Sequence, residues 1–305
     1  MITAQNWNIP NAPVVGYAWE IENPTGIVLI THALAEYAQR LHDRYNQLIP
    51  ALNRAGFSVY AYDLRGHGDS PGDISMVDAF AQVQDHLAAR QALKIRHPKL
   101  PFYLFAHSAG ALFAAGSVIS DQAGLDGVIL SSPMLQAGQD QVALIRRIMP
   151  IASMMAPSLA IIPINSRGLS RIDAEVEAYL ADQRIYHGKV KLLTANSMML
   201  LAQELWPHYT TWRVPTLVFY GSADQVSYMG GLPEFFNKLA TTDKTLRLFA
   251  EGYHELLNDL DRDAALALIL EWLAARTSSP AAGEDKLAAQ QQRLAQLRQA
   301  RTRKN

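Results

Sequence analysis

Residues 102–115 read Phe-Tyr-Leu-Phe-Ala-His-Ser-Ala-Gly-Ala-Leu-Phe-Ala-Ala, and they are the most informative segment of the chain. A short apolar and aromatic run, typical of a buried strand, meets Ser108, and a run of helix-forming residues follows at once. Small residues on both sides of Ser108 permit a tight strand-to-helix turn, which lifts a serine hydroxyl above the sheet edge. Because the first N–H groups of the helix then point at the serine, the pattern predicts nucleophilic catalysis. The plainer alternative for Ser108 is a helix N-cap.

Two later strand-like runs each lead to a residue that a nucleophilic serine requires. A serine hydroxyl is a weak nucleophile, so it needs a histidine base that a carboxylate orients. Residues 214–221 form an apolar run that leads to Asp224, and residues 245–249 form an alternating run that leads to His254. The order Ser, Asp, His along the chain is that of the α/β-hydrolases. We therefore expect Asp224 to orient His254, and His254 to take the proton of Ser108.

The two partners of Ser108 have plainer alternatives as well. Asp224 would be an ordinary turn residue if Asp259 or Asp261 supplied the acid, although both follow His254 and break the expected order. The separate alternative for His254 is an ordinary histidine of a surface loop. Two further histidines are expected to be hydrogen-bonded structural residues: His67 and His107.

Strand-like and helix-like segments alternate along most of the chain. Strands are expected near residues 14–21, 26–31, 57–63, 102–107, 128–130, 214–221 and 245–249, and helices over residues 41–55 and 76–95. Such alternation predicts a mostly parallel central sheet with helices on both faces. The sequence contains no dinucleotide-binding fingerprint, Walker loop, zincin motif or internal repeat.

These motifs, taken in order, resemble the monoacylglycerol lipase/lysophospholipase branch of the α/β-hydrolases. The likeness spans about Trp7 to Ala275 and rests on seven segments: His32-Ala-Leu-Ala-Glu36-Tyr-Ala-Gln-Arg40, Asp63-Leu-Arg-Gly-His67-Gly-Asp-Ser70-Pro-Gly72, Ala106-His-Ser108-Ala-Gly110-Ala, Ser131-Ser-Pro-Met, Tyr186-His-Gly-Lys, Gly221-Ser-Ala-Asp224 and Gly252-Tyr-His254. The resemblance implies an α/β-hydrolase fold and hydrolysis of a single-chain lipid ester through an acyl-enzyme, with no cofactor and no metal. It does not choose between monoacylglycerols and lysophospholipids.

The resemblance also implies roles for residues around the nucleophile. The backbone N–H groups of Leu34 and Ala109 would form the oxyanion hole. Glu36 and Arg40 would lie around the glycerol or head-group end of the substrate. The alternative for this pair is a solvated salt bridge on the first turn of a helix.

The chain departs from the pattern of this branch at several small residues. Alanine replaces the usual glycine at positions 33, 106 and 111, and Tyr37 replaces a common histidine. If the loop needs a positive φ at Ala33, its Cβ costs about 1 kcal/mol or shifts the Leu34 N–H. These glycine losses motivate one alternative, a degenerate hydrolase that only binds its ligand. Three others would use the same three residues and stay open: an acyltransferase, a general carboxylesterase, and a haloperoxidase-like or carbon–carbon hydrolase.

The alternation breaks between residues 135 and 193. Residues 142–164 form an apolar, methionine-bearing run that two arginines and several prolines interrupt, which excludes a clean membrane span of roughly 20 residues. We predict an inserted helical cap at 135–193, with the hydrolase core at 1–134 and 194–276. Part of its apolar face would line the acyl channel and touch membranes or micelles, with three flexible side chains named for this role: Met149, Met154 and Met155. The alternative is that they only pack the cap onto the sheet.

Composition favours a packed globular enzyme without an overall charged surface. The 305 residues include 49% hydrophobic and 18% charged residues, with a net charge of −1. This balance argues against nucleic acid as a partner. The absence of cysteine excludes disulfides, thiolate catalysis and cysteine-ligated metals. The N-terminus lacks the pattern of a signal peptide, so a cytoplasmic location is expected. Residues 277–305 form a basic tail, predicted to be helical or disordered, and the oligomeric state stays open.

Overall fold

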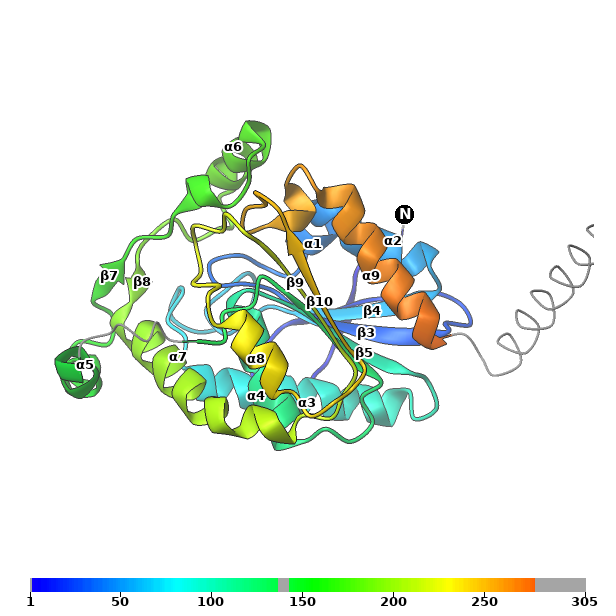
Figure 1. Cartoon of the computed structure of the whole chain (residues 1–305), viewed down its shortest axis with the longest axis horizontal. Coiled ribbons are helices and arrows are strands. Elements are labelled where there is room, and N and C mark those ends of the chain that lie inside the picture. Colours follow the sequence, from blue (N-terminus) through cyan, green and yellow to red (C-terminus); the bar gives the residue numbers. More distant parts are fainter. Residues whose placement is uncertain (1, 137–142, 278–305) are drawn as a thin grey trace, which may run out of the picture.

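The computed structural model describes residues 2–136 and 143–277, and a twisted central sheet forms the middle of this part (Figure 1). Its eight strands lie in the order β1-β2-β4-β3-β5-β6-β9-β10. The first two strands are antiparallel to their neighbours, and the other six run parallel. The strands are β1 Gln5–Trp7, β2 Gly16–Trp19, β3 Gly26–Thr31, β4 Phe57–Tyr62, β5 Phe102–His107, β6 Gly127–Ser131, β9 Thr216–Gly221 and β10 Lys244–Phe249. The predicted mostly parallel sheet is confirmed.

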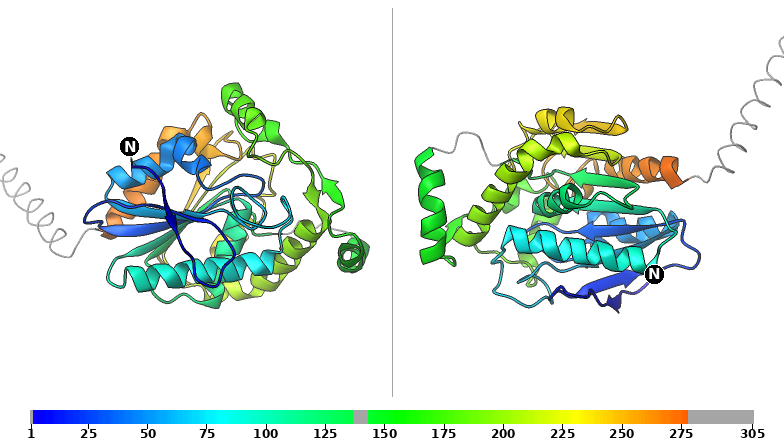
Figure 2. Two further views of the ribbon diagram at one scale, coloured as in Figure 1. Left: turned by 180° about the vertical axis from the view of Figure 1, so that it is seen from behind. Right: turned by 90° about the horizontal axis from the view of Figure 1, so that it is seen from below.

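Helices cover both faces of this sheet (Figures 1 and 2). One face carries α3 Ala79–Arg96, α4 Ala109–Ser120, α7 Leu192–Leu205 and α8 Leu232–Lys238, and the other carries α1 Arg40–Asp43, α2 Leu48–Arg54 and α9 Arg262–Thr277. Side chains of a strand alternate between the two faces. Along β5, Leu104 and Ala106 join the core under α3 and α4, whereas Tyr103 and Phe105 join the core under α2 and α9. Burial on both faces explains why β5 is apolar throughout.

The helix expected over residues 41–55 is interrupted. Tyr45, Asn46 and Gln47 have left-handed φ angles of 52°, so the segment divides into α1, the short 3-10 helix η1 Tyr45–Gln47 and α2. The Tyr45 N–H donates to the Asn258 side chain at 2.5 Å, a tertiary contact that helical periodicity does not reveal. The short edge strand β1 is a further element that the sequence patterns did not predict.

The segment between β6 and α7, called the insertion here, arcs along one side of the molecule (Figure 1). It contains α5 Ala143–Met155, β7 Ala160–Ile162, the 3-10 helix η2 Ser166–Gly168, α6 Asp173–Ala181 and β8 Val190–Lys191. The expected helices are present, and β7 and β8 add a small antiparallel sheet. The predicted tail lies outside the described residues except for Thr277, where α9 ends. No helix in the described part is both long and apolar enough to cross a bilayer.

Candidate active site

Ser108 lies at the sharp turn between β5 and α4. Its φ of 53° and ψ of −121° are a strained conformation for a residue with a side chain, of the kind found at a nucleophile elbow. The turn is fixed by the Ser108 N–H, which donates to Ser131 O at 3.0 Å, and by Ser108 O, which accepts from the Met134 N–H at 3.1 Å. A Cβ on Gly110 would lie 2.4 Å from His32 O, so only glycine lets α4 approach the loop after β3 this closely.

Three polar side chains that are far apart in the sequence meet at this turn. His254 Nε2 is 2.9 Å from Ser108 Oγ, and His254 Nδ1 is 2.7 Å from Asp224 Oδ2. An ionised carboxylate only accepts hydrogen bonds, so Nδ1 carries the proton and the Nε2 lone pair faces the serine hydroxyl. Burial disfavours ionisation of Asp224, but His254 and the N–H groups of Val226 and Ser227 outweigh it and lower its pKa. The geometry is that of a serine, its base and an orienting acid.

The rival carboxylates have other partners. Asp259 accepts from Arg171 Nε at 2.9 Å and from the Tyr253 N–H at 2.9 Å, and Asp261 accepts from Arg171 at 2.6 Å. Neither contacts His254 among the hydrogen bonds of the described residues. Both lie on the side of the histidine loop, defined here as residues 250–261, that faces the insertion.

His67 and His107 each hydrogen-bond a backbone carbonyl through Nδ1: the former contacts Arg65 O at 3.0 Å, the latter Ser131 O at 3.1 Å. Burial, together with a neighbouring histidine, lowers the pKa of each to about 3, so both are neutral near pH 7. His107 also borders the cavity described below.

The loop after β3, residues 32–36, presents a free N–H group beside the nucleophile. The Ala33 N–H donates to Glu36 Oε1 at 2.8 Å, and His32 Nε2 accepts from the Leu64 N–H at 3.0 Å. The N–H groups of Leu34 and Ala109 have no acceptor within residues 2–136 and 143–277, and both residues border the same cavity. The left-handed residue of the loop is Ala35, with φ of 71°, and not Ala33. Alanine at position 33 therefore fits the loop without that strain.

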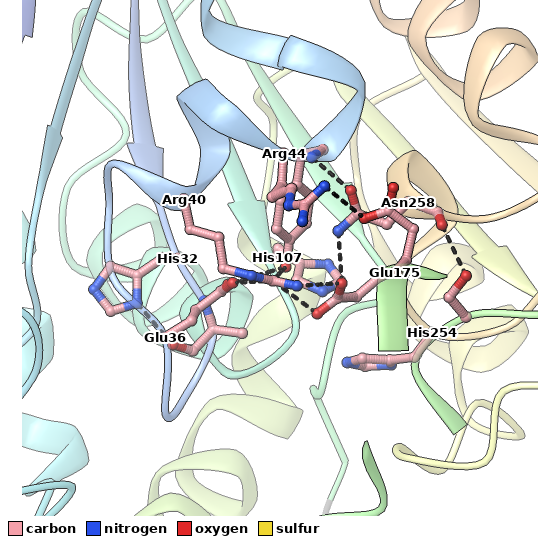
Figure 3. Close-up of polar contacts among 12 residues, drawn as sticks. His32, Glu36, Arg40, Arg44, His107, Glu175, His254 and Asn258 are labelled. Carbon is pink, nitrogen blue, oxygen red and sulfur yellow. Dashed lines mark hydrogen bonds and ion pairs between the residues drawn. The ribbon is translucent and has the colours of Figure 1, made fainter. Parts of the chain in front are cut away.

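Glu36 and Arg40 belong to a buried ionic network (Figure 3). Arg40 donates to Glu36 at 2.6 Å and to both carboxylate oxygens of Glu255 at 3.0 Å. Although burial disfavours the charged carboxylate, Arg40 lowers the pKa of Glu255 to about 2. Glu36 borders the cavity, whereas Arg40 does not. Glu255 is a site residue that sequence patterns missed; its only signal is its position next to His254.

A cavity of about 570 Å³ opens beside Ser108, inside the range of about 300–1,000 Å³ that is usual for small-molecule sites. Glu36, Glu255 and Tyr179, which all contact Arg40, line one part of it together with His107, and this part is called its polar end here. Other polar lining residues are Gln136, Asn165, Gln225, Ser227 and Tyr228, and the apolar ones include Leu112, Met134, Met149, Ile161, Met198 and Met199. No lysine or arginine of the described residues lines it. Of the three predicted methionines, only Met149 reaches the cavity; Met154 and Met155 are 85% and 82% exposed on α5.

Comparisons with known proteins show to which family the chain belongs. A family model described as "Serine aminopeptidase, S33" matches residues 22–261. The chain belongs to this family. Within it, the chain is similar to a monoacylglycerol lipase of Mycolicibacterium smegmatis, with 27% identity over 254 residues that cover 82% of this chain and 89% of the relative. A human monoglyceride lipase is 26% identical over 260 residues, 84% of each chain. The crystal structure of a Paleococcus ferrophilus monoacylglycerol lipase superposes with a TM-score of 0.75 at 25% identity, covering 86% of this chain and 99% of that one.

Proposed function

We propose that this protein is a serine hydrolase that cleaves the carboxylic ester of a single-chain lipid. The observation that carries the proposal is the relay from Asp224 through His254 to Ser108 Oγ, with hydrogen bonds of 2.7 and 2.9 Å at the wall of an apolar cavity. Its similarity to monoacylglycerol lipases supports the same class of reaction.

The reacting proton moves between Ser108, His254 and the alcohol or water, and it does not pass to Asp224. His254 Nε2 takes the hydroxyl proton as Ser108 Oγ attacks the ester carbonyl, and Asp224 stabilises the resulting imidazolium. His254 then gives the proton to the departing alcohol, which leaves the acyl group on Ser108. In the second half, His254 removes a proton from water as the water oxygen attacks the acyl carbon. The bond between that carbon and Ser108 Oγ then breaks, His254 gives the proton to Ser108 Oγ, and the fatty acid is released.

The negative charge of each tetrahedral intermediate falls on the carbonyl oxygen. The unpaired N–H groups of Leu34 and Ala109 are suited to receive it because nothing else in the described protein occupies them. A donor held at the position where the charge develops lowers the activation barrier by roughly 3 kcal/mol.

The cavity favours an uncharged alcohol over a phosphate-bearing one. Glu36 and Glu255 line its polar end, whereas Arg40, which is hydrogen-bonded to both carboxylates, does not border the cavity. A phosphate at this end would meet negative charge without a lysine or arginine to pair with it, which is unfavourable in a site shielded from water. A monoacylglycerol therefore fits the polar end better than a lysophospholipid, and its acyl chain fits the apolar part.

The exposed face of α5 is suited to a lipid surface. Ile151, Met154 and Met155 expose 63%, 85% and 82% of their side chains, while Met149 of the same helix borders the cavity. A helix that exposes apolar side chains on one side and borders the cavity with the other would bring the cavity close to a lipid aggregate. The predicted cytoplasmic location stays a prediction.

Hydrolysis of matched lipids tests the proposal. Wild-type protein is expected to release oleate from monooleoylglycerol and, at least tenfold more slowly, from oleoyl lysophosphatidylcholine, whereas Ser108→Ala releases none. Equal rates for the two lipids would contradict the neutral head group, and unchanged activity of Ser108→Ala would contradict the nucleophile. Oleoyl transfer to an added alcohol in place of oleate release would indicate an acyltransferase.

A further inference from the structure

The inner half of the insertion, defined here as residues 166–187, is bonded to both loops that carry the reaction. On one side it meets the histidine loop. The N–H groups of His254 and Glu255 donate to Gly168 O at 3.4 Å and Leu169 O at 2.8 Å. Farther along, Ser170 Oγ donates to Asn258 O at 2.8 Å. The backbone around the base is therefore held by the insertion as well as by the core.

Arg171 adds ion pairs to this contact between the insertion and the histidine loop. Its backbone N–H and its Nε reach Asp259, at 2.8 Å to Oδ1 and 2.9 Å to Oδ2, and another guanidinium nitrogen reaches Asp261 at 2.6 Å. The carboxylate of Asp259 is fully buried and also accepts from the N–H of Tyr253, the residue before His254. Charge-assisted pairs of this geometry are strong and directional. Arg171 is thus connected to His254 through the carboxylate of Asp259 and the peptide group of Tyr253.

The same half of the insertion also contacts the loop after β3, which carries the unpaired Leu34 N–H, and the residue that follows this loop. The Tyr186 N–H donates to Ala35 O at 2.8 Å, and Tyr37 Oη donates to Asp182 Oδ2 at 2.7 Å. The Arg184 guanidinium stacks 4.0 Å from the centre of the Tyr37 ring. A weaker ion pair joins Glu175 of α6 to Arg44 at 3.7 Å (Figure 3).

We propose that the inner half of the insertion is a bracket that fixes the histidine loop relative to the loop after β3, and that Arg171 is its main positioning residue. Arg171 does not border the cavity, so it acts on the reaction through the histidine loop, by way of Asp259 with the Tyr253 N–H and by way of Asp261. A small displacement of a base or an oxyanion donor lowers kcat far more than it raises KM. The outer part of the insertion, with α5 and β7, has no such bond to either loop among the described residues.

The test rests on the proposed ester hydrolysis and compares Arg171→Ala with Arg167→Ala. Arg167 lies four residues away in the same insertion, is exposed, and makes no ion pair or hydrogen bond with the described residues. Arg171→Ala is expected to lower kcat about 10- to 100-fold with KM changed less than about threefold. The loss is expected to be equal for p-nitrophenyl acetate and p-nitrophenyl laurate, and Arg171→Lys should recover part of it. Arg167→Ala should match the wild type.

Three results would overturn the bracket. The first is a kcat for Arg171→Ala equal to that of Arg167→Ala. The second is a loss of kcat with the laurate ester alone, which would mean that Arg171 covers the acyl chain. The third is a loss of kcat that disappears when rates are corrected for the fraction of folded protein. Should Arg171→Ala not fold, Asp259→Asn is measured in its place with the same expected split between kcat and KM. A wild-type protein without esterase activity would instead refute the proposed function.

Discussion

Replacing Arg40 with methionine removes the cation between two buried carboxylates. In the wild type, Arg40 pairs with Glu36 at 2.6 Å and with Glu255 at 3.0 Å, and all three side chains are buried. Methionine keeps much of the side-chain volume but leaves both carboxylates without a charged partner. Loss of one member of a buried ion pair typically costs about 3–5 kcal/mol, so we expect a decrease of that size in the free energy of unfolding at pH 7.5.

The pH dependence of this decrease has a definite sign. Arg40 holds the folded-state pKa of Glu255 at about 2, below its value in the unfolded chain. The stability that this pair contributes is therefore present above about pH 4.5, the unfolded value, and lost as the pH falls toward 2. In Arg40→Met the buried carboxyl group takes up a proton more readily, so the difference between wild type and variant should narrow as the pH falls from 7.5 to 4.5.

Urea denaturation at the two pH values measures this difference. Arg96→Met is the matched control, because Arg96 makes two hydrogen bonds to Glu20 of 3.0 and 2.9 Å at the surface. An exposed pair contributes about 0–1 kcal/mol, so the control should lose little stability. A loss in Arg40→Met no larger than that of the control, or a difference that widens at low pH, would refute the reasoning.

Three further changes test the site from other directions. Asp224→Asn should lower kcat about 10⁴-fold in steady-state assays because the amide no longer holds the productive tautomer of the base; a loss below tenfold would argue against its role as the acid. Gly110→Ala places a Cβ 2.4 Å from His32 O and should lower the thermal midpoint, with a stability cost of about 1–3 kcal/mol; an unchanged midpoint would contradict the close approach of α4. Met154→Ser combined with Met155→Ser should weaken binding to phosphatidylcholine vesicles and leave hydrolysis of a soluble acetate ester unchanged, since both side chains lie outside the cavity. Equal vesicle binding would contradict the lipid-surface proposal.

The sheet and the meeting of Ser108, Asp224 and His254 followed from local patterns. Ser108 comes directly after β5, Asp224 follows the end of β9 by three residues, and His254 follows the end of β10 by five. Parallel strands bring their carboxyl ends to one edge of a sheet. The elbow was visible because small residues flank the serine and a helix follows it. Topology alone thus brings the three side chains to one place.

Contacts between distant loops left no such pattern. Nothing in the residues around Arg40 indicated that Glu255 would pair with it, and the pairing of Arg171 with Asp259 joins two segments of irregular backbone. The left-handed φ at Ala35 also left no signal, because the glycine that is usual in the resembling branch stands at position 33 and not at position 35. The exposure of Met154 and Met155 depends on how α5 is turned, and an apolar, proline-bearing run does not fix that orientation.

Covalent labelling with a fluorophosphonate, followed by peptide mass mapping, tests whether Ser108 is the activated nucleophile. The wild type should carry one phosphonyl group, located on the Ser108 peptide. Ser108→Ala should carry none, and His254→Ala should label at least about 10³-fold more slowly because no base activates the hydroxyl. A label on another residue of the wild type, or a label that persists in Ser108→Ala, would contradict the account.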